Sequence, residues 1–148
     1  MICHYFLNIK KRTTQKETTT KDPILVIKQG EKGALCVQPN GQFVQCSLGQ
    51  HIKTLKLPVV EAKENENSNS SCQFNVVDTT GAGDAFGGAF IAYWQAHNDL
   101  KLALKHAVAS GTLNCMRVGA CPTPLSETQI ALVAEQLSIK EGFFVLRS

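Results

Sequence analysis

The sequence lacks the features that mark membrane-spanning, secreted and metal-binding proteins. None of its apolar runs approaches the about 20 residues that a membrane-spanning helix needs. Its six cysteines form no Cys-x-x-Cys pair, and no histidine stands at zinc-finger spacing from them. The apolar residues 1–9 precede their positive charges, which is the reverse of a secretory signal. We therefore expect a cytoplasmic protein with free thiols, and the Thr-rich, acid-poor residues 10–21 leave organellar targeting open.

Positive charge is concentrated in the first 21 residues and is balanced elsewhere. Residues 1–21 hold five of the fifteen Lys and Arg residues and one of the twelve acids, which leaves ten basic and eleven acidic residues for the rest. The rest of the chain therefore has no cationic face of the kind that binds nucleic acid. With 148 residues, 43% of them hydrophobic, the chain can build one domain with a buried core.

Three zones of different character are expected along the chain. Residues 1–21 show no sustained apolar period and predict a poorly ordered tail, which leaves one domain over residues 22–148. Within that domain, residues 61–71 are polar and of low complexity, so we expect a surface loop there. Strand patterns fill residues 22–60, and strands and helices alternate from residue 72 onward.

The strand patterns of the first half include a hairpin. Residues 23–27 are a short apolar run of the buried-strand type that ends in a glycine-punctuated loop. Residues 34–38 and 42–46 flank Pro39-Asn-Gly41, a turn sequence suited to joining two antiparallel strands. Residues 52–60 alternate imperfectly between apolar and polar side chains.

The second half predicts one short strand, three helices and a last strand. Residues 74–77 predict a strand that leads directly into a helix. Two further helices are expected at residues 100–116 and 126–137, and Ser126-Glu-Thr-Gln129 forms a capping-box sequence at the start of the latter. Residues 143–146 predict the last strand.

Asp78-Thr-Thr-Gly-Ala-Gly-Asp84 is the segment with the strongest chemical signal. A strand enters a glycine turn in which a helix begins, so free backbone N–H groups and the helix dipole attract an anion. Gly81 and Gly83 let the backbone approach that anion without a Cβ in the way. Asp84 stands in the first helical turn, where a carboxylate beside a bound anion can accept the proton of an attacking hydroxyl.

Taken without its neighbours, the glycine turn is explained equally well as a helix start with a favourable aspartate. A P-loop is excluded because Gly83 is followed by Asp84 and not by lysine. A dinucleotide-binding fingerprint is excluded because the third glycine, Gly87, comes one position late. The turn by itself thus predicts an anion site and leaves the ligand open.

Continued through Ala85-Phe-Gly-Gly-Ala-Phe90, the same segment closely resembles the C-terminal signature of the PfkB/ribokinase family of carbohydrate kinases. The resemblance implies a phosphotransferase that uses ATP and Mg²⁺ to phosphorylate a sugar or nucleoside hydroxyl. It implies that Gly81, Ala82 and Gly83 form the anion hole and that Asp84 is the catalytic base. It also implies a three-layer α/β/α fold in which a hairpin joins a mostly parallel sheet.

Two flanking segments extend the resemblance. Residues 28–33 are similar to the family's nucleotide loop, which assigns nucleotide binding to Lys28, Gly30, Lys32, Gly33 and the nearby Gly83. Residues 107–123 look like the segment that borders the adenine, with Val108 where many relatives have asparagine, so we expect no polar adenine contact there. In members that need a monovalent cation, the positions that would hold potassium match Asp78, Thr80, Asn114, Arg117, Gly119 and Thr123.

The resemblance covers residues 23–137, which match only the C-terminal part of the family pattern. The N-terminal part normally supplies the lid, most sugar contacts and an Asn-x-x-Glu motif for magnesium, and no asparagine here is followed three residues later by glutamate. Two functions therefore stay open: a sugar kinase, and a truncated, inactive nucleotide-binding fragment or subunit. In both cases, uncovered sheet surface favours self-association.

Overall fold

Short strands that follow one another along the chain build the sheet of this protein. The computed structural model describes residues 4–7, 23–48, 74–120 and 124–144, with the backbone alone described for 4–7. The sheet has the order β1-β2-β3-β4-β5, and every neighbouring pair is antiparallel. Its strands are β1 (His4–Leu7), β2 (Ile24–Lys28), β3 (Ala34–Val37), β4 (Gln42–Ser47) and β5 (Ser138–Phe143).

The expectation of a mostly parallel sheet is wrong. It came from the family resemblance and requires strands that alternate with helices, but residues 74–79, which include the strand expected at 74–77, form neither strand nor helix. Val76 and Val77 are each 54% exposed, whereas a central parallel strand is buried on both faces. β2, β3 and β4 instead follow one another through short loops, and such loops join antiparallel strands.

The two edges of the sheet also differ from expectation. β1 pairs with β2 over its whole length, so this part of the expected tail belongs to the sheet. β5 begins at Ser138, earlier than the strand expected at residues 143–146. Most of its side chains are exposed, including Lys140 and Glu141, so its sequence carries little apolar signal. Pairing with β4 is what holds this segment as a strand.

The hairpin expected around residues 39–41 is confirmed. The N–H of Gln38 donates to the carbonyl of Gln42 at 2.8 Å, and the N–H of Gly41 donates to the carbonyl of Gln38 at 2.9 Å. Asn40 Oδ1 accepts the N–H of Gln42 at 2.9 Å. Gly41 has a φ of 83°, a conformation that glycine adopts without strain. Local turn chemistry thus sets β3 beside β4.

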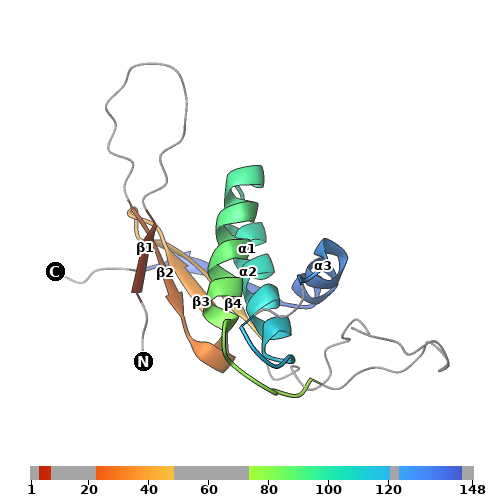
Figure 1. Cartoon of the computed structure of the whole chain (residues 1–148). Coiled ribbons are helices and arrows are strands. Elements are labelled where there is room, and N and C mark those ends of the chain that lie inside the picture. Colours follow the sequence, from red (N-terminus) through yellow and green to blue (C-terminus); the bar gives the residue numbers. More distant parts are fainter. Residues whose placement is uncertain (1–3, 8–22, 49–73, 121–123, 145–148) are drawn as a thin grey trace.

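Three helices, α1 (Ala82–His97), α2 (Leu100–Asn114) and α3 (Glu127–Glu135), lie on the same side of the sheet (Figure 1). α2 is the central one and contacts α1, α3, β3 and β4. α3 opens with the expected capping box, in which Ser126 and Gln129 each accept the other's backbone N–H. No helix in the described part of the chain has the length and apolar character needed to cross a membrane.

Side chains of the sheet alternate between a buried face and a partly exposed face. The strand register places one row against the helices, where all members are buried: Val26, Cys36 and Val44. It places a second apolar row on the other face, where all members are partly exposed: Leu25, Val37 and Phe43. Within the described residues, the fold therefore consists of two layers and lacks the third layer that we expected.

Replacing Gly88 by alanine is expected to stabilise the protein. Gly88 is exposed in the interior of α1, and a Cβ built there meets no atom within 4 Å. Because glycine loses more backbone entropy than alanine in a helix, the free energy of unfolding should rise by about 0.5–1 kcal/mol. Thermal unfolding followed by circular dichroism measures the change. A lowered midpoint would show that this face of α1 has no room for a methyl group.

Candidate anion and nucleotide site

Within the described residues, the glycine turn that opens α1 leaves two backbone donors without acceptors. Gly81 caps the helix with a φ of 75°, and its carbonyl accepts the first helical hydrogen bonds. The N–H of Ala82 donates to the carbonyl of Thr79 over 3.3 Å. The N–H groups of Gly81 and Gly83 have no hydrogen-bond acceptor among the described residues. Of the three donors expected at residues 81–83, these two are available to an anion at a helix N-terminus.

Only glycine fits at position 81, for two reasons. Its φ of 75° lies in the left-handed region, which is strained for residues that carry a Cβ. A Cβ would also stand 2.8 Å from both the Cα and the carbonyl oxygen of Ala120. The turn is therefore pressed against the segment that follows α2.

Asp78 links the turn to the same segment. Its Oδ1 accepts the N–H of Thr80 at 2.9 Å and the hydroxyl of Thr80 at 2.7 Å. Its Oδ2 accepts the N–H of Gly119 at 2.8 Å. The hydroxyl of Thr80, the N–H of Thr80 and the N–H of Gly119 lower the pKa of Asp78 below its usual value. Asp78 therefore stays ionised at neutral pH as an acceptor of three hydrogen bonds.

Four of the six residues expected to hold potassium are joined by direct hydrogen bonds. Besides the three bonds of Asp78, the Nδ2 of Asn114 donates to the carbonyl of Thr80 at 2.8 Å. Both oxygens of Asp78 and the carbonyl of Thr80 thus accept hydrogen bonds from protein groups. Thr123 lies outside the described residues. The potassium assignment stays a prediction.

A cavity of about 370 Å³ lies between the turn, β2 and α2. It brings together four of the five residues expected to bind the nucleotide, namely Lys28, Gly30, Gly33 and Gly83. Lys32 is exposed and lies outside the lining. The larger apolar side chains of the lining are Leu48, Phe74, Val76, Phe86 and Val108. This combination of many apolar walls and a few polar groups is typical of a small-molecule site.

Lys28 brings a positive charge to the glycine turn. It is the last residue of β2 and reaches toward the start of α1, because a Cβ built on Gly83 would lie 2.7 Å from its Nζ. The ammonium group therefore faces the same region as the free N–H of Gly83. An anion bound between this cation and the positive end of the helix would be attracted by both.

Asp84 lines a second cavity of about 280 Å³. Asp84 is exposed in the first turn of α1, so its carboxylate is accessible to a ligand. Lys28, Gly83 and Phe86 line both cavities, so they form the wall that the two spaces share.

Several lining residues were missed by the sequence interpretation. Phe74 and Val76 were assigned to a strand, whereas they belong to a loop that borders the first cavity. Cys115 also lines it, and burial together with the charge of Asp78 raises the pKa of that thiol. The contact of Cys115 with the loop is direct, since its carbonyl accepts the N–H groups of Val77 and Asp78 at 2.8 and 3.1 Å. No local pattern marks these residues as ligand contacts.

The cysteines of the described core are free thiols, as expected. Cys36 and Cys46 face the helices from β3 and β4 and are completely buried. Burial raises the pKa of each to about 12. They are therefore protonated at neutral pH and serve as small apolar core residues.

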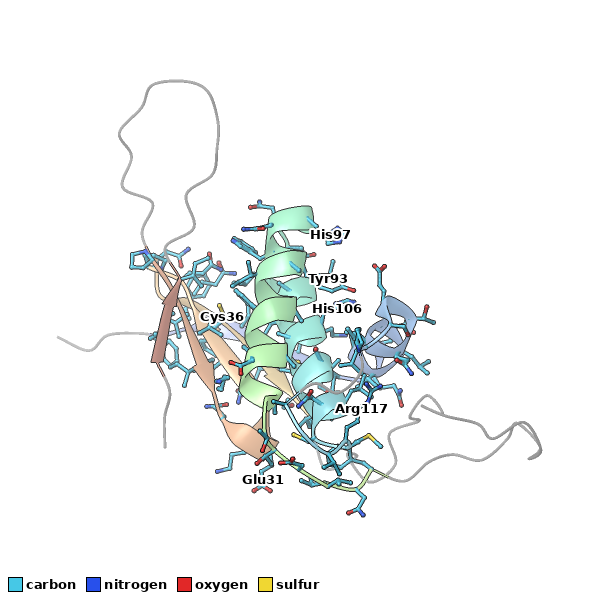
Figure 2. All side chains as sticks on the ribbon, viewed as in Figure 1. Glu31, Cys36, Tyr93, His97, His106 and Arg117 are labelled. Carbon is cyan, nitrogen blue, oxygen red and sulfur yellow. The ribbon has the colours of Figure 1, made fainter. Side chains whose placement is uncertain are left out.

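The histidines of α1 and α2 lie away from the two cavities. Glu31 and Arg117 lie toward the end of the molecule where α1 begins, whereas Tyr93, His97 and His106 lie toward the other end of that helix (Figure 2). The ring of Tyr93 stacks on that of His106 at a centroid distance of 3.8 Å. His106 is buried, and its Nδ1 lies 2.8 Å from the carbonyl of Leu102. These rings pack the helices together.

Comparison with known proteins identifies the family. The profile of the pfkB family carbohydrate kinases matches residues 8–128 and so begins inside the expected tail. The ATP-dependent ribose-1-phosphate kinase of Halopiger xanaduensis is 30% identical over 115 residues, which are 78% of this chain and 31% of that protein.

Solved structures agree in fold. One assigned as a phosphofructokinase from Staphylococcus aureus has a TM-score of 0.55 and 18% identity, over 80% of this chain and 29% of its own. One assigned as a sugar kinase from Clostridium perfringens has a TM-score of 0.55 and 13% identity, over 82% and 31%. The chain thus spans less than a third of each of these relatives. With its glycine turn in place and most of its length matched, the chain belongs to the pfkB family of carbohydrate kinases.

Proposed function

We propose that this chain supplies the nucleotide-binding and catalytic-base part of a kinase that transfers the γ-phosphoryl group of ATP to a sugar or nucleoside hydroxyl. The observation that carries the proposal is the shared wall of Lys28 and Gly83 between two cavities. The first cavity has the apolar walls that suit a nucleoside, and the second contains Asp84. Phosphoryl transfer needs a donor space, an acceptor space and cationic groups between them.

In the proposed reaction, the residues of this chain bind, orient and move one proton. The base of the nucleotide lies among Val76, Val108 and their apolar neighbours, and the phosphates meet Lys28 and the N–H groups of the turn. Asp84 accepts the proton of the acceptor hydroxyl as its oxygen attacks the γ-phosphorus and the bond to the β–γ bridging oxygen breaks. ADP and a phosphate ester result. Magnesium bound with the nucleotide would neutralise charge on the phosphates.

Nucleotide binding is the part of the proposal that can be tested with this chain alone. Mg²⁺ in kinase sites is typically held by substrate phosphates and one or two carboxylates, so magnesium would enter with the nucleotide. The acceptor is proposed to be a sugar, a sugar phosphate or a nucleoside. The relative named as a ribose-1-phosphate kinase supports a phosphorylated pentose as the first acceptor to try.

A truncated, inactive nucleotide-binding fragment or subunit is the second candidate. The observation that favours it is that the chain spans less than a third of each relative. Positioning of the acceptor supplies much of the catalysis in a transfer reaction. The family's N-terminal part, which normally supplies most sugar contacts, lies outside the match. The apolar row of Leu25, Val37 and Phe43 on the open face of the sheet would favour association with a second copy or a further chain.

The test is calorimetric titration of the purified chain with Mg·ATP, followed by a transfer assay with a panel of pentoses, pentose phosphates and nucleosides. Binding together with transfer is the expected result for a kinase, and the panel names the acceptor class. Binding without transfer would leave the nucleotide-binding fragment. A folded chain that binds neither ATP nor ADP would overturn both candidates.

A further inference from the structure

Asn114 is a buried amide that reaches from the core to the glycine turn. It is the last residue of α2 and is 2% exposed. Its Nδ2 donates to the carbonyl of Thr80 at 2.8 Å, across 34 positions of sequence. A buried polar side chain needs such a partner, because leaving it unpaired costs about 1–3 kcal/mol. The amide and the carbonyl are therefore held together firmly.

This bond sets the direction of the next N–H in the chain. The carbonyl of Thr80 and the N–H of Gly81 belong to one planar peptide unit, and no peptide bond in the described chain is cis. In a trans peptide the C=O and N–H point in opposite directions. Because the carbonyl of Thr80 points toward Asn114 in the core, the N–H of Gly81 points away from it. That N–H is one of the two donors without an acceptor among the described residues.

The rest of Thr80 is held as firmly as its carbonyl. Its N–H and its hydroxyl both donate to Asp78, at 2.9 and 2.7 Å. Gly81 itself lies against Ala120, with no space for a Cβ between them. The peptide between Thr80 and Gly81 therefore cannot rotate without breaking the bond to Asn114.

We propose that Asn114 is a positioning residue of the anion hole: by holding the carbonyl of Thr80, it aims the N–H of Gly81 at a phosphate oxygen of the bound nucleotide. This inference rests on the proposed nucleotide-binding function. Asn114 is absent from the lining of both cavities and so acts through the turn. A donor that is aimed in advance stabilises an anion without the cost of turning toward it.

The test compares the affinities of ADP and adenosine in Asn114→Leu, which keeps the size and neutrality of the side chain and removes its donor. ADP affinity should fall about tenfold, the lower range for a hydrogen bond to a charged group. Adenosine affinity should stay unchanged, because the walls that meet the nucleoside are untouched. Asn114→Ser is polar, neutral and too short to reach Thr80, so it gives the same test if the leucine variant does not fold.

Leu113→Val is the matched control, since it alters a neighbouring core residue that is 1% exposed and lines neither cavity. It should lower stability and leave both affinities as they are. In the wild-type chain, the amide signal of Gly81 in a ¹H–¹⁵N spectrum should shift when ADP is added. If the wild type binds ADP but the Gly81 signal does not move, the inference is wrong and the proposed function stands. The same holds if a folded Asn114 variant binds ADP as tightly as the wild type. Absence of ADP binding in the wild type would overturn the proposed function and the inference with it.

Discussion

Replacing Asp84 by asparagine is expected to lower the rate of phosphoryl transfer by about 10²–10⁴-fold, the usual contribution of a general base. Asparagine keeps the size of the side chain but cannot accept the proton of the acceptor hydroxyl. ATP affinity should stay equal or become tighter, because the carboxylate in the first turn of α1 would repel the phosphates of a nucleotide bound as proposed. Steady-state kinetics measures the first effect and calorimetry the second.

Asp99→Asn provides the matched control for the loss of one negative charge. Asp99 caps α2 by accepting the N–H groups of Lys101 and Leu102 at 2.9 and 3.1 Å, and it lines neither cavity. Asparagine caps a helix as well as aspartate does, so turnover and ATP affinity should not change. If Asp84→Asn transfers phosphate as fast as the wild type, Asp84 is not the base. The affinity measurement remains informative even in a chain that binds ATP without turning over.

Replacing Gly33 by alanine is expected to destabilise the fold by at least about 2 kcal/mol, the cost of strained backbone combined with a collision. Gly33 ends the short 3₁₀ turn Gly30–Lys32 with φ 92° and ψ −130°, a region essentially closed to other residues. A Cβ there would overlap the backbone carbonyl of Cys46 on β4. Backbone atoms of a paired strand cannot move aside cheaply. Urea unfolding measures the loss, and ATP affinity should fall as well because Gly33 lines the first cavity.

Gly30→Ala separates strain from collision in the same loop. Gly30 also has a positive φ, 61°, but a Cβ built there meets no atom within 4 Å. Its substitution should therefore cost only the backbone strain, about 1–2 kcal/mol. Equal losses for the two variants would show that β4 yields to the added methyl group at position 33.

Elements with local causes could be predicted from the sequence. The turn Pro39-Asn-Gly41 predicts the hairpin of β3 and β4, and the Ser126/Gln129 pair predicts the start of α3. Both depend on hydrogen bonds between residues two to four positions apart. The start of α1 at the glycine turn follows in the same way, since Gly81 alone tolerates the φ that ends the incoming loop.

The direction of the strands and the position of β5 could not be predicted in this way. The apolar run Phe74-Asn-Val-Val77 has the composition of a strand, but its valines are exposed and no strand in the described part of the chain pairs with it. β5 carries a lysine and a glutamate in its middle and is a strand because β4 pairs with it. Pairing depends on partners far away in the chain, which periodicity does not record.

The candidate site likewise combines features that the local sequence sets with contacts that only the fold creates. The sequence by itself determined the chemistry of the glycine turn, because Gly81, Gly83 and Asp84 are neighbours whose spacing alone creates donors and a carboxylate at a helix start. Only the tertiary structure decided that Lys28 faces Gly83, that two cavities share this wall, and that Asn114 holds the turn from the core. Those relations join β2, α1 and α2, and packing of separate elements, not local spacing, sets which of their residues meet.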